Sequence, residues 1–165
     1  MFRAALLVSA LTAMVSVSPA MATIHVYDFV MDGFQETPPV ATPGTGNCHV
    51  TLDDLSFDYT VNCTFSGLIG TTNNAHIHGP APIGSPASVI VGLTFDFGVT
   101  AGNITGAGTL SAVNAQHVLD GNTYVNLHTT FRPGGEIRGQ IVPEPATAML
   151  LAFGGLIAIR RRRRR

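Results

Sequence analysis

Three histidines are the side chains in this sequence whose type and spacing best suit metal chemistry. His76 and His78 flank Ile77, and His128 ends the segment 124–128. In a β-strand, successive side chains point to opposite faces, so His76 and His78 leave one face and Ile77 leaves the other. Two imidazoles one strand step apart can hold a single metal ion, because neutral imidazole is a good ligand for zinc and copper.

His128 has the same kind of setting. In segment 124–129 the two apolar residues share one face, while Tyr124, Asn126 and His128 share the other. Two hypotheses remain open at this point. The three histidines form one metal site, or they are structural and bond to backbone carbonyls or to Asn74 and Asn126. If a metal binds, three histidines with an open position are typical of catalytic rather than structural sites.

The other histidines are weaker candidates. His25 offers a fourth ligand, but we expect it to face solvent. His49 follows Cys48 and precedes Val50, so on a strand it faces away from both and is expected to be exposed. His117 has no partner that the sequence identifies.

The elements that must position these side chains are almost all strands. Alternating or apolar runs separated by glycine and proline predict strands at residues 24–31, 46–53, 57–66, 74–78, 87–97, 104–111, 122–131 and 135–141. Residues 112–119 are either a short helix or a loop. Many short strands with turn signals between them predict an all-β fold, an antiparallel Greek-key sandwich or barrel.

Two cysteines flank a predicted hairpin. Pairing residue 52 with 59 and residue 50 with 61 places Cys48 opposite Cys63. Directly opposed residues have Cβ atoms about 4.5–5.5 Å apart, close to what a disulfide requires. We therefore predict a Cys48–Cys63 disulfide, which suits an oxidising compartment.

The charge of the central part excludes one class of partner. Between Thr23 and Val142 the only basic side chains are Arg132 and Arg138, against nine acidic ones. Nucleic acid binding depends on lysine and arginine neutralising phosphates, so we expect no nucleic acid partner. For Arg138 we expect a salt bridge across the sheet. About 120 residues suffice for one domain, which we place at residues 23–141.

Both ends of the chain are predicted to be targeting segments. Residues 1–22 have the pattern of a secretory signal, with Arg3, an apolar stretch at 4–17 and the cleavage pattern Ala20-Met21-Ala22. Residues 142–165 hold Pro143, Glu144 and Pro145, then 14 mostly apolar residues and six arginines. That run is shorter than the roughly 20 residues that span a bilayer comfortably.

The second of these segments resembles the PEP-CTERM sorting signal of Gram-negative bacteria, because all three of its parts occur in order. The resemblance implies export, transient membrane anchoring by the tail, and processing near the motif by an exosortase-type enzyme. It further implies delivery to the cell surface or the extracellular matrix.

Four segments in the remaining chain together resemble the CHRD domain: 35–40 (QETPPV), 75–81 (AHIHGPA), 121–129 (GNTYVNLHT) and 134–141 (GGEIRGQI). The resemblance implies an extracellular all-β domain that acts as a binding or structural module. Its expected partners are extracellular matrix or polysaccharide.

A more distant likeness is to the copper/zinc superoxide dismutases, which are Greek-key barrels. Their histidine pair on one strand and late histidine correspond to His76, His78 and His128. The likeness implies a copper-only site, with zinc the less favoured metal, because the zinc loop and the bridging histidine have no counterpart here. It gives the alternative function, a superoxide dismutase-like enzyme with Arg132 as a guide for a small anion.

Overall fold

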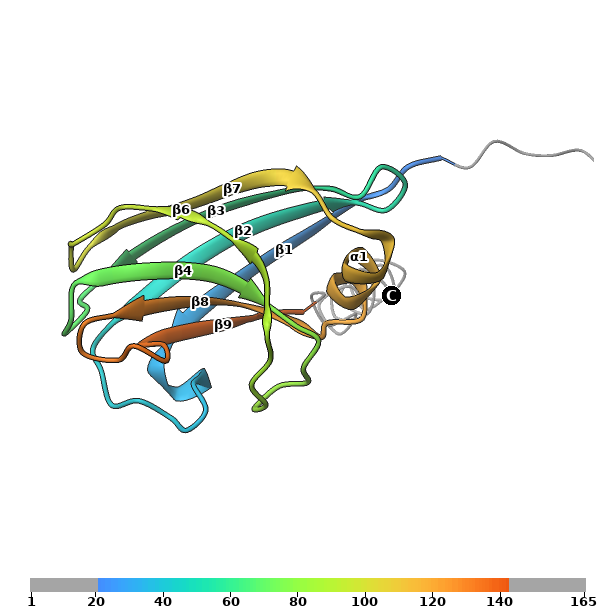
Figure 1. Ribbon diagram of the computed structural model, residues 1–165. Coiled ribbons are helices and arrows are strands. Elements are labelled where there is room, and N and C mark those ends of the chain that lie inside the picture. The colour runs from blue at the N-terminus through green and yellow to red at the C-terminus, as the bar shows by residue number, and fades with distance from the viewer. Residues whose placement is uncertain (1–20, 143–165) are drawn as a thin grey trace, which may run out of the picture.

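A computed structural model describes residues 21–142, and in this range one antiparallel sheet curves into an almost closed barrel (Figure 1). The all-β prediction is confirmed. The nine strands are β1 (Ile24–Asp32), β2 (Thr45–Asp53), β3 (Asp58–Ser66), β4 (Thr72–His78), β5 (Val89–Gly92), β6 (Thr94–Phe95), β7 (Gly102–Thr109), β8 (Thr123–Thr129) and β9 (Ile137–Ile141).

The order of strands around the sheet is β5-β4-β8-β9-β1-β2-β3-β7-β6. Strands β1, β2 and β3 follow one another, whereas the chain passes from β3 to β4 and from β7 to β8 without pairing them directly. These crossing connections are consistent with the predicted Greek-key barrel. The two ends of the order, β5 and β6, are joined by Leu93, whose N–H donates to the Ala75 carbonyl oxygen at 2.9 Å. This bond helps to close the barrel.

Inward-facing apolar side chains fill the barrel, and a short helix packs at one end. Helix α1 (Ala112–Leu119) begins at Ser111, whose Oγ accepts the Asn114 N–H, and it buries Ala115 and Val118 (Figure 1). The helical alternative for this segment is therefore correct. The largest fully buried apolar side chains of the core include Tyr27, Met31, Leu52, Ile77, Ile104, Leu127, Ile137 and Ile141.

The predicted hairpin and its disulfide are confirmed. Strands β2 and β3 pair Leu52 with Tyr59 and Cys48 with Cys63, and the two cysteines are bonded. Both cysteine side chains are buried on the inner face of the barrel wall.

The single strand predicted at 87–97 is wrong. It consists of β5, which pairs with β4, and β6, which pairs with β7. The alternation of its apolar residues suggested one face, but Val89 lies opposite His78 and is half exposed, while Leu93 is buried. At Leu93 the chain stops pairing with β4 and begins to pair with β7, and hydropathy alone does not reveal such a change of pairing strand.

The barrel wall has two different halves. The open half is the outer face of β1, β2, β3 and β7, where buried and exposed residues alternate, as along β3. The covered half is β4, β8 and β9 with the loops 79–88 and 130–136 that bond to their outer face. Every residue of β8 and β9 is buried. The covered half holds the candidate site.

No helix within residues 21–142 is both long and apolar enough to cross a membrane. The predicted sorting motif Pro143-Glu144-Pro145 and the segments that follow it lie outside the described residues, as does nearly all of the predicted secretory signal.

Candidate metal centre

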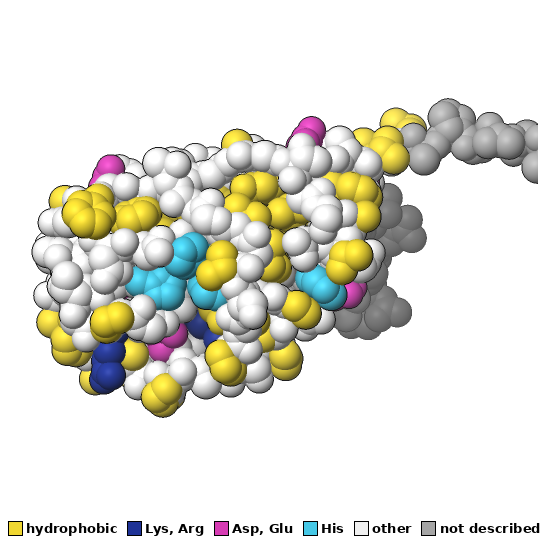
Figure 2. All heavy atoms as spheres, viewed as in Figure 1, with side chains coloured by type: hydrophobic (Ala, Val, Ile, Leu, Met, Phe, Trp, Pro, Cys, Tyr) yellow, Lys and Arg dark blue, Asp and Glu magenta, His cyan; other side chains and the backbone are white. Residues whose placement is uncertain are grey.

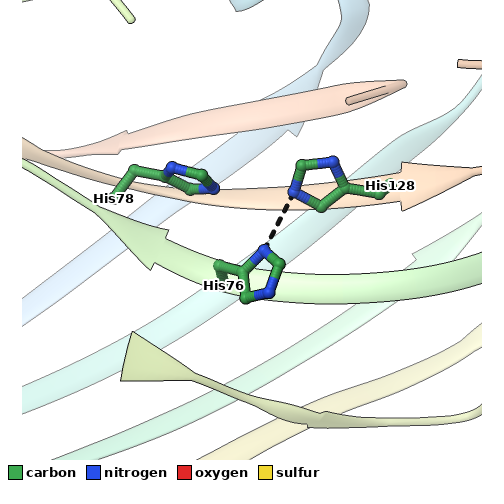
Figure 3. A group of neighbouring side chains, drawn as sticks. All are labelled: His76, His78 and His128. Carbon is green, nitrogen blue, oxygen red and sulfur yellow. Dashed lines mark hydrogen bonds between the residues drawn. The ribbon is translucent and has the colours of Figure 1, made fainter. Parts of the chain in front are cut away.

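The three candidate histidines converge on the outer face of neighbouring strands. His76 and His78 come from β4 and His128 from β8, and the register places His128 diagonally from His76 (Figure 3). One ring nitrogen of each lies within 4.8 Å of the others. The structure therefore brings together the three residues that the sequence singled out.

Hydrogen bonds to backbone carbonyls orient two of the rings. His78 Nδ1 lies 2.9 Å from the Ala87 oxygen, and His128 Nδ1 lies 2.9 Å from the Pro133 oxygen. A carbonyl only accepts, so each Nδ1 is assigned the proton, and in the neutral ring Nε2 keeps a free lone pair. Such outer bonds fix the tautomer and orientation of metal-binding histidines.

The nitrogens left over are the ones that face the cluster. His128 Nε2 lies 3.1 Å from His76 Nδ1 (Figure 3). His78 Nε2 is buried and has no hydrogen-bond partner among the described residues. A buried polar atom without a partner is costly and calls for an explanation such as an ion. The two interpretations of the sequence are thus compatible, because the carbonyl bonds use Nδ1 and leave Nε2 available.

The cluster favours uncharged imidazoles. Burial lowers the pKa of His76, His78 and His128 below the ordinary value, and the charge of His128 lowers the pKa of His76 and His78 further. The carbonyl bonds from Ala87 and Pro133 oppose the shift only in part. Neutral imidazole is the form that binds a metal, so these shifts favour the binding form. With its proton on Nδ1, His128 accepts at Nε2 from His76 Nδ1–H, so in the metal-free protein the His76 proton must move to Nε2 before Nδ1 can bind a metal.

One side of the cluster is open to solvent. His76 is half-buried, and its cross-strand neighbour in β5 is Gly92. Directly paired residues project to the same face, and a Cβ built on Gly92 would meet nothing within 4 Å. Figure 2 shows histidine side chains gathered at the surface on this face of the molecule. His76 is therefore the member of the cluster that an outside molecule reaches first.

The sequence placed Tyr124 and Asn126 on the histidine face of β8, but it did not predict how polar side chains pack around the cluster. The Tyr124 ring stacks on His78, with centroids 5.0 Å apart and planes 4° apart. On β9, Arg138 and Gln140 share the outer face with Tyr124 and Asn126, to which they are paired. The alternation of residue types in β8 and β9 shows that these polar side chains share one face. Without knowledge of the loops above that face, the alternation predicts a solvent-exposed face.

The predicted salt bridge of Arg138 is not formed. Among the described residues no carboxylate oxygen lies within salt-bridge distance of this side chain, although it is 2% exposed. Its Cζ lies 3.4 Å from the centroid of the Tyr124 ring instead, and its guanidinium donates to the Ser85 oxygen and to Gln140 Oε1, both at 2.8 Å.

Arg132 lies apart from this network. It is exposed, and its guanidinium sits 5.4 Å from the Phe131 ring centroid. It belongs to the same loop as Pro133, whose oxygen accepts from His128. The structure thus places Arg132 near the cluster along the chain, in a solvent-facing position.

Two buried glutamates close to the site behave in opposite ways. Burial raises the pKa of Glu36 to about 7, against the lowering effect of Arg138, and its Oε1 has no hydrogen-bond partner among the described residues. Burial would also raise the pKa of Glu136, but four hydrogen bonds outweigh it and the pKa is lowered. Those donors are Thr42, Ile69, Gly70 and Thr129.

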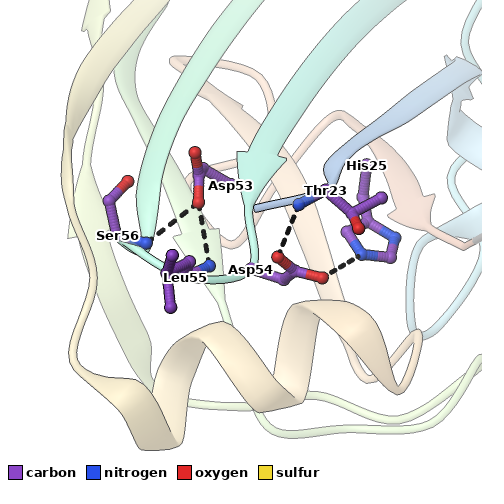
Figure 4. Close-up of polar contacts among 6 residues, drawn as sticks. All are labelled: Thr23, His25, Asp53, Asp54, Leu55 and Ser56. Atoms are coloured by element: carbon purple, nitrogen blue, oxygen red, sulfur yellow. Dashed lines mark hydrogen bonds and ion pairs between the residues drawn. The ribbon is translucent and has the colours of Figure 1, made fainter. Parts of the chain in front are cut away.

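The remaining candidate ligand lies elsewhere. His25 Nε2 is 3.2 Å from Asp54 Oδ2, beside the Asp53–Ser56 turn (Figure 4). His49 Nδ1 is 2.8 Å from Asp28 Oδ1 on the open half. His25 is thus not part of the three-histidine group.

Comparisons with known proteins agree with the sequence patterns. Residues 142–165 match the PEP-CTERM protein-sorting motif. No curated protein and no solved structure matches the chain, so the likeness to superoxide dismutases remains a prediction. Residues 27–141 match the CHRD domain, which covers more than half of the sequence and all nine strands but for the first three residues of β1. The chain therefore belongs to the CHRD domain family.

Proposed function

We propose that this protein is a cell-surface module whose CHRD domain binds one metal ion through His76, His78 and His128. The observation that carries the proposal is the convergence of three ring nitrogens within 4.8 Å, one of them buried without a partner. The sorting motif makes it an exported protein, anchored or processed at the cell envelope as is typical of Gram-negative bacteria.

Copper is the metal that we propose, with zinc less favoured. An all-imidazole donor set suits copper, zinc and nickel, and affinity for such a set generally peaks at copper(II). His78 and His128 would present Nε2, and His76 would present Nδ1. When bound, copper supplies one-electron redox chemistry, while the chain supplies orientation and uncharged ligands.

The sorting motif implies processing by an exosortase-type enzyme. We propose a signal segment at residues 1–22, a transient membrane anchor in the tail, and final delivery to the cell surface or matrix. An extracellular polysaccharide or matrix component is the proposed partner. A hollow of about 290 Å³ in the open half supports this, because it is lined by amide and hydroxyl side chains such as Asn47, Asn62 and Thr105. Such groups bond equally to donors and acceptors of a sugar.

A second candidate function is superoxide dismutase-like activity. The open side of the cluster at Gly92 favours it, because a small reactant needs access to the metal. Arg132 is the proposed anion guide. It is one of only two cations in an acidic domain that would otherwise repel superoxide.

Copper titration of the purified full-length protein without an affinity tag tests the first proposal. We expect one tightly bound copper per chain, lost in His78→Ala. The matched control is His49→Ala, which removes an exposed histidine of the open half and should leave copper binding intact. Equal binding by wild type and His78→Ala would refute the proposed site.

Superoxide turnover of the copper-loaded protein tests the second. An enzyme should turn over at a rate that falls with added salt and in Arg132→Gln, because both weaken attraction of the anion. Stoichiometric copper without turnover would leave the binding module as the function and exclude the enzyme.

A further inference from the structure

Loop 79–88 holds His78 in one orientation through a single residue, Ala87. The Ala87 oxygen accepts from His78 Nδ1 at 2.9 Å, and the Ala87 N–H donates to the Tyr124 hydroxyl at 3.0 Å. The Tyr124 ring is in turn stacked on His78. One tyrosine therefore contacts the histidine ring directly and also anchors the carbonyl that selects its tautomer.

The same loop is fixed from strand β9. Arg138 donates to the Ser85 oxygen, and Gln140 Nε2 donates to the Ala81 oxygen at 3.0 Å. His78 comes from β4 and Arg138 from β9, which flank β8 on its two sides. The Tyr124 ring thus lies between an imidazole and a guanidinium, at 5.0 Å and 3.4 Å between the ring centroid and the centre of each group.

This arrangement has a large desolvation cost, so stability alone does not account for it. Arg138 is buried without an ion pair among the described residues, and taking a cation out of water has a large cost unless it is well compensated. Arg138 is compensated by two hydrogen bonds, by a cation–π contact, which is stronger when desolvated, and by attraction to Glu36 when that carboxyl is charged. What the arrangement achieves is a fixed carbonyl at Ala87 and a flat surface against His78.

We propose that Tyr124 and Arg138 are positioning residues of the three-histidine centre. They hold His78 as the Nδ1–H tautomer, with Nε2 directed at His76 and His128. As a statement about metal affinity, this rests on the proposed function. As a statement about the imidazole itself, it applies to the metal-free protein. Outer partners of this kind typically change metal affinity 10- to 100-fold when they are removed.

Three variants separate the contributions. Tyr124→Phe keeps the ring and removes only the hydroxyl that accepts from Ala87. Arg138→Met keeps much of the length and removes the guanidinium, while Arg138→Lys restores the charge without the planar group. The matched control is Tyr27→Phe, because Tyr27 is 1% exposed and its hydroxyl has no partner among the described residues.

The primary measurement is ¹⁵N NMR of the histidine rings in the metal-free protein, which reports the tautomer of each imidazole. We expect wild type and Tyr27→Phe to show His78 as one Nδ1–H tautomer. Tyr124→Phe and Arg138→Met should show mixed tautomers and bind copper about 10- to 100-fold more weakly, with Arg138→Lys between them and wild type. Unchanged signals from β1–β3 confirm that a variant is folded.

The outcomes distinguish the two proposals. A single unchanged His78 tautomer in folded Tyr124→Phe and Arg138→Met overturns the positioning role, whatever the copper result. If Arg138→Met does not fold, Tyr124→Phe alone decides. If tautomers shift as expected but wild type binds no copper, the metal function fails and the positioning of His78 stands.

Discussion

The two halves of this barrel wall differ in how the outer faces of their strands are treated. In the open half, one face of each strand meets the core and the other meets water, as in the strict alternation of β3. In the covered half, β8 and β9 are buried on both faces, although their outer side chains include Arg138, Gln140 and Asn126. Most of those polar groups bond to loops or to one another instead of to water.

The difference explains where a metal site can form. On the open half, side chains such as Asn62 are exposed to solvent. On the covered half, loop carbonyls at Ala87 and Pro133 fix two imidazoles, and Tyr124 supports one of them. A binding group needs such support to hold a defined geometry. The covering loops, more than the strands, therefore fix the orientation of the histidine rings.

The largest difference between the halves is expected for buried and exposed carboxylates. Glu136 is fully buried and accepts four hydrogen bonds, two from the backbone of residues 69 and 70. In Glu136→Gln an NH₂ group faces donors, so we expect a loss of about 4 kcal/mol in the free energy of unfolding. Asp58→Asn on the open half should cost less than about 1 kcal/mol. Urea denaturation compares them, and equal losses would mean that burial does not separate the halves.

The disulfide tests whether the halves are energetically independent. It closes a loop of 15 residues within the open half, so replacing both Cys48 and Cys63 by alanine should cost about 3 kcal/mol. The variant that remains folded should keep wild-type copper affinity, because the histidines lie on the other half. Calorimetric unfolding and copper titration measure the two quantities. Weakened copper binding in the folded variant would show that the open half supports the site.

Most of the open half was predictable from the sequence. Alternation in β2 and β3 fixed the strands, and the pairing of Leu52 with Tyr59 placed Cys48 opposite Cys63 as the structure has it. Where only one face of a strand is buried, apolar and polar residues alternate along it, so the sequence itself shows which face is buried. The histidine group was predictable for the same reason, since the face that each ring leaves follows from strand periodicity.

The covered half was not predictable, and the reason is physical. A strand buried under loops has polar residues on its outer face, so Tyr124 and Arg138 give the same pattern as a solvent-exposed strand. Which loop covers them depends on contacts distant in sequence, such as Arg138 with Ser85 and Gln140 with Gly121. Neither the unpaired Arg138 nor the raised pKa of Glu36 leaves a local signal in the chain.

Glu36, beside Arg138 and Asn126 of the covered half, should make the stability of the protein depend on pH. Its pKa is raised by burial from 4.5 to about 7, so between these values the folded protein holds a proton that the unfolded chain has released. This contribution lowers stability as pH rises from about 4.5 to 7. The lowered pKa values of the histidines act oppositely and lower stability as pH falls below 6.5.

The variant Glu36→Gln isolates the first contribution. Its stability relative to wild type should increase with pH across this window and then level off, by up to about 3 kcal/mol, because 2.5 pKa units correspond to that energy. Urea unfolding of both proteins from pH 4.5 to 8.5 measures the difference. Arg138 and Asn126 act on the Glu36 carboxylate only in wild type, and their lowering effects are already part of its pKa of about 7. A difference that does not change with pH would contradict the prediction.

The smallest expected effect comes from one substitution made on each half. Asn126 is 3% exposed, and its Nδ2 lies 3.5 Å from the Gly134 oxygen, so Asn126→Ala removes packing and a weak bond to the covering loop. Because its Oδ1 has no partner among the described residues, removing that buried atom offsets part of the loss, and we expect a cost of about 1 kcal/mol. Asn62→Ala, on the outer face of β3, should change stability by less than about 0.5 kcal/mol. Chemical denaturation of both variants resolves this difference. If both substitutions lower the free energy of unfolding equally, the outer face of β3 contributes to stability as much as a covered surface does. The two halves would then differ in solvent exposure but not in energetic contribution.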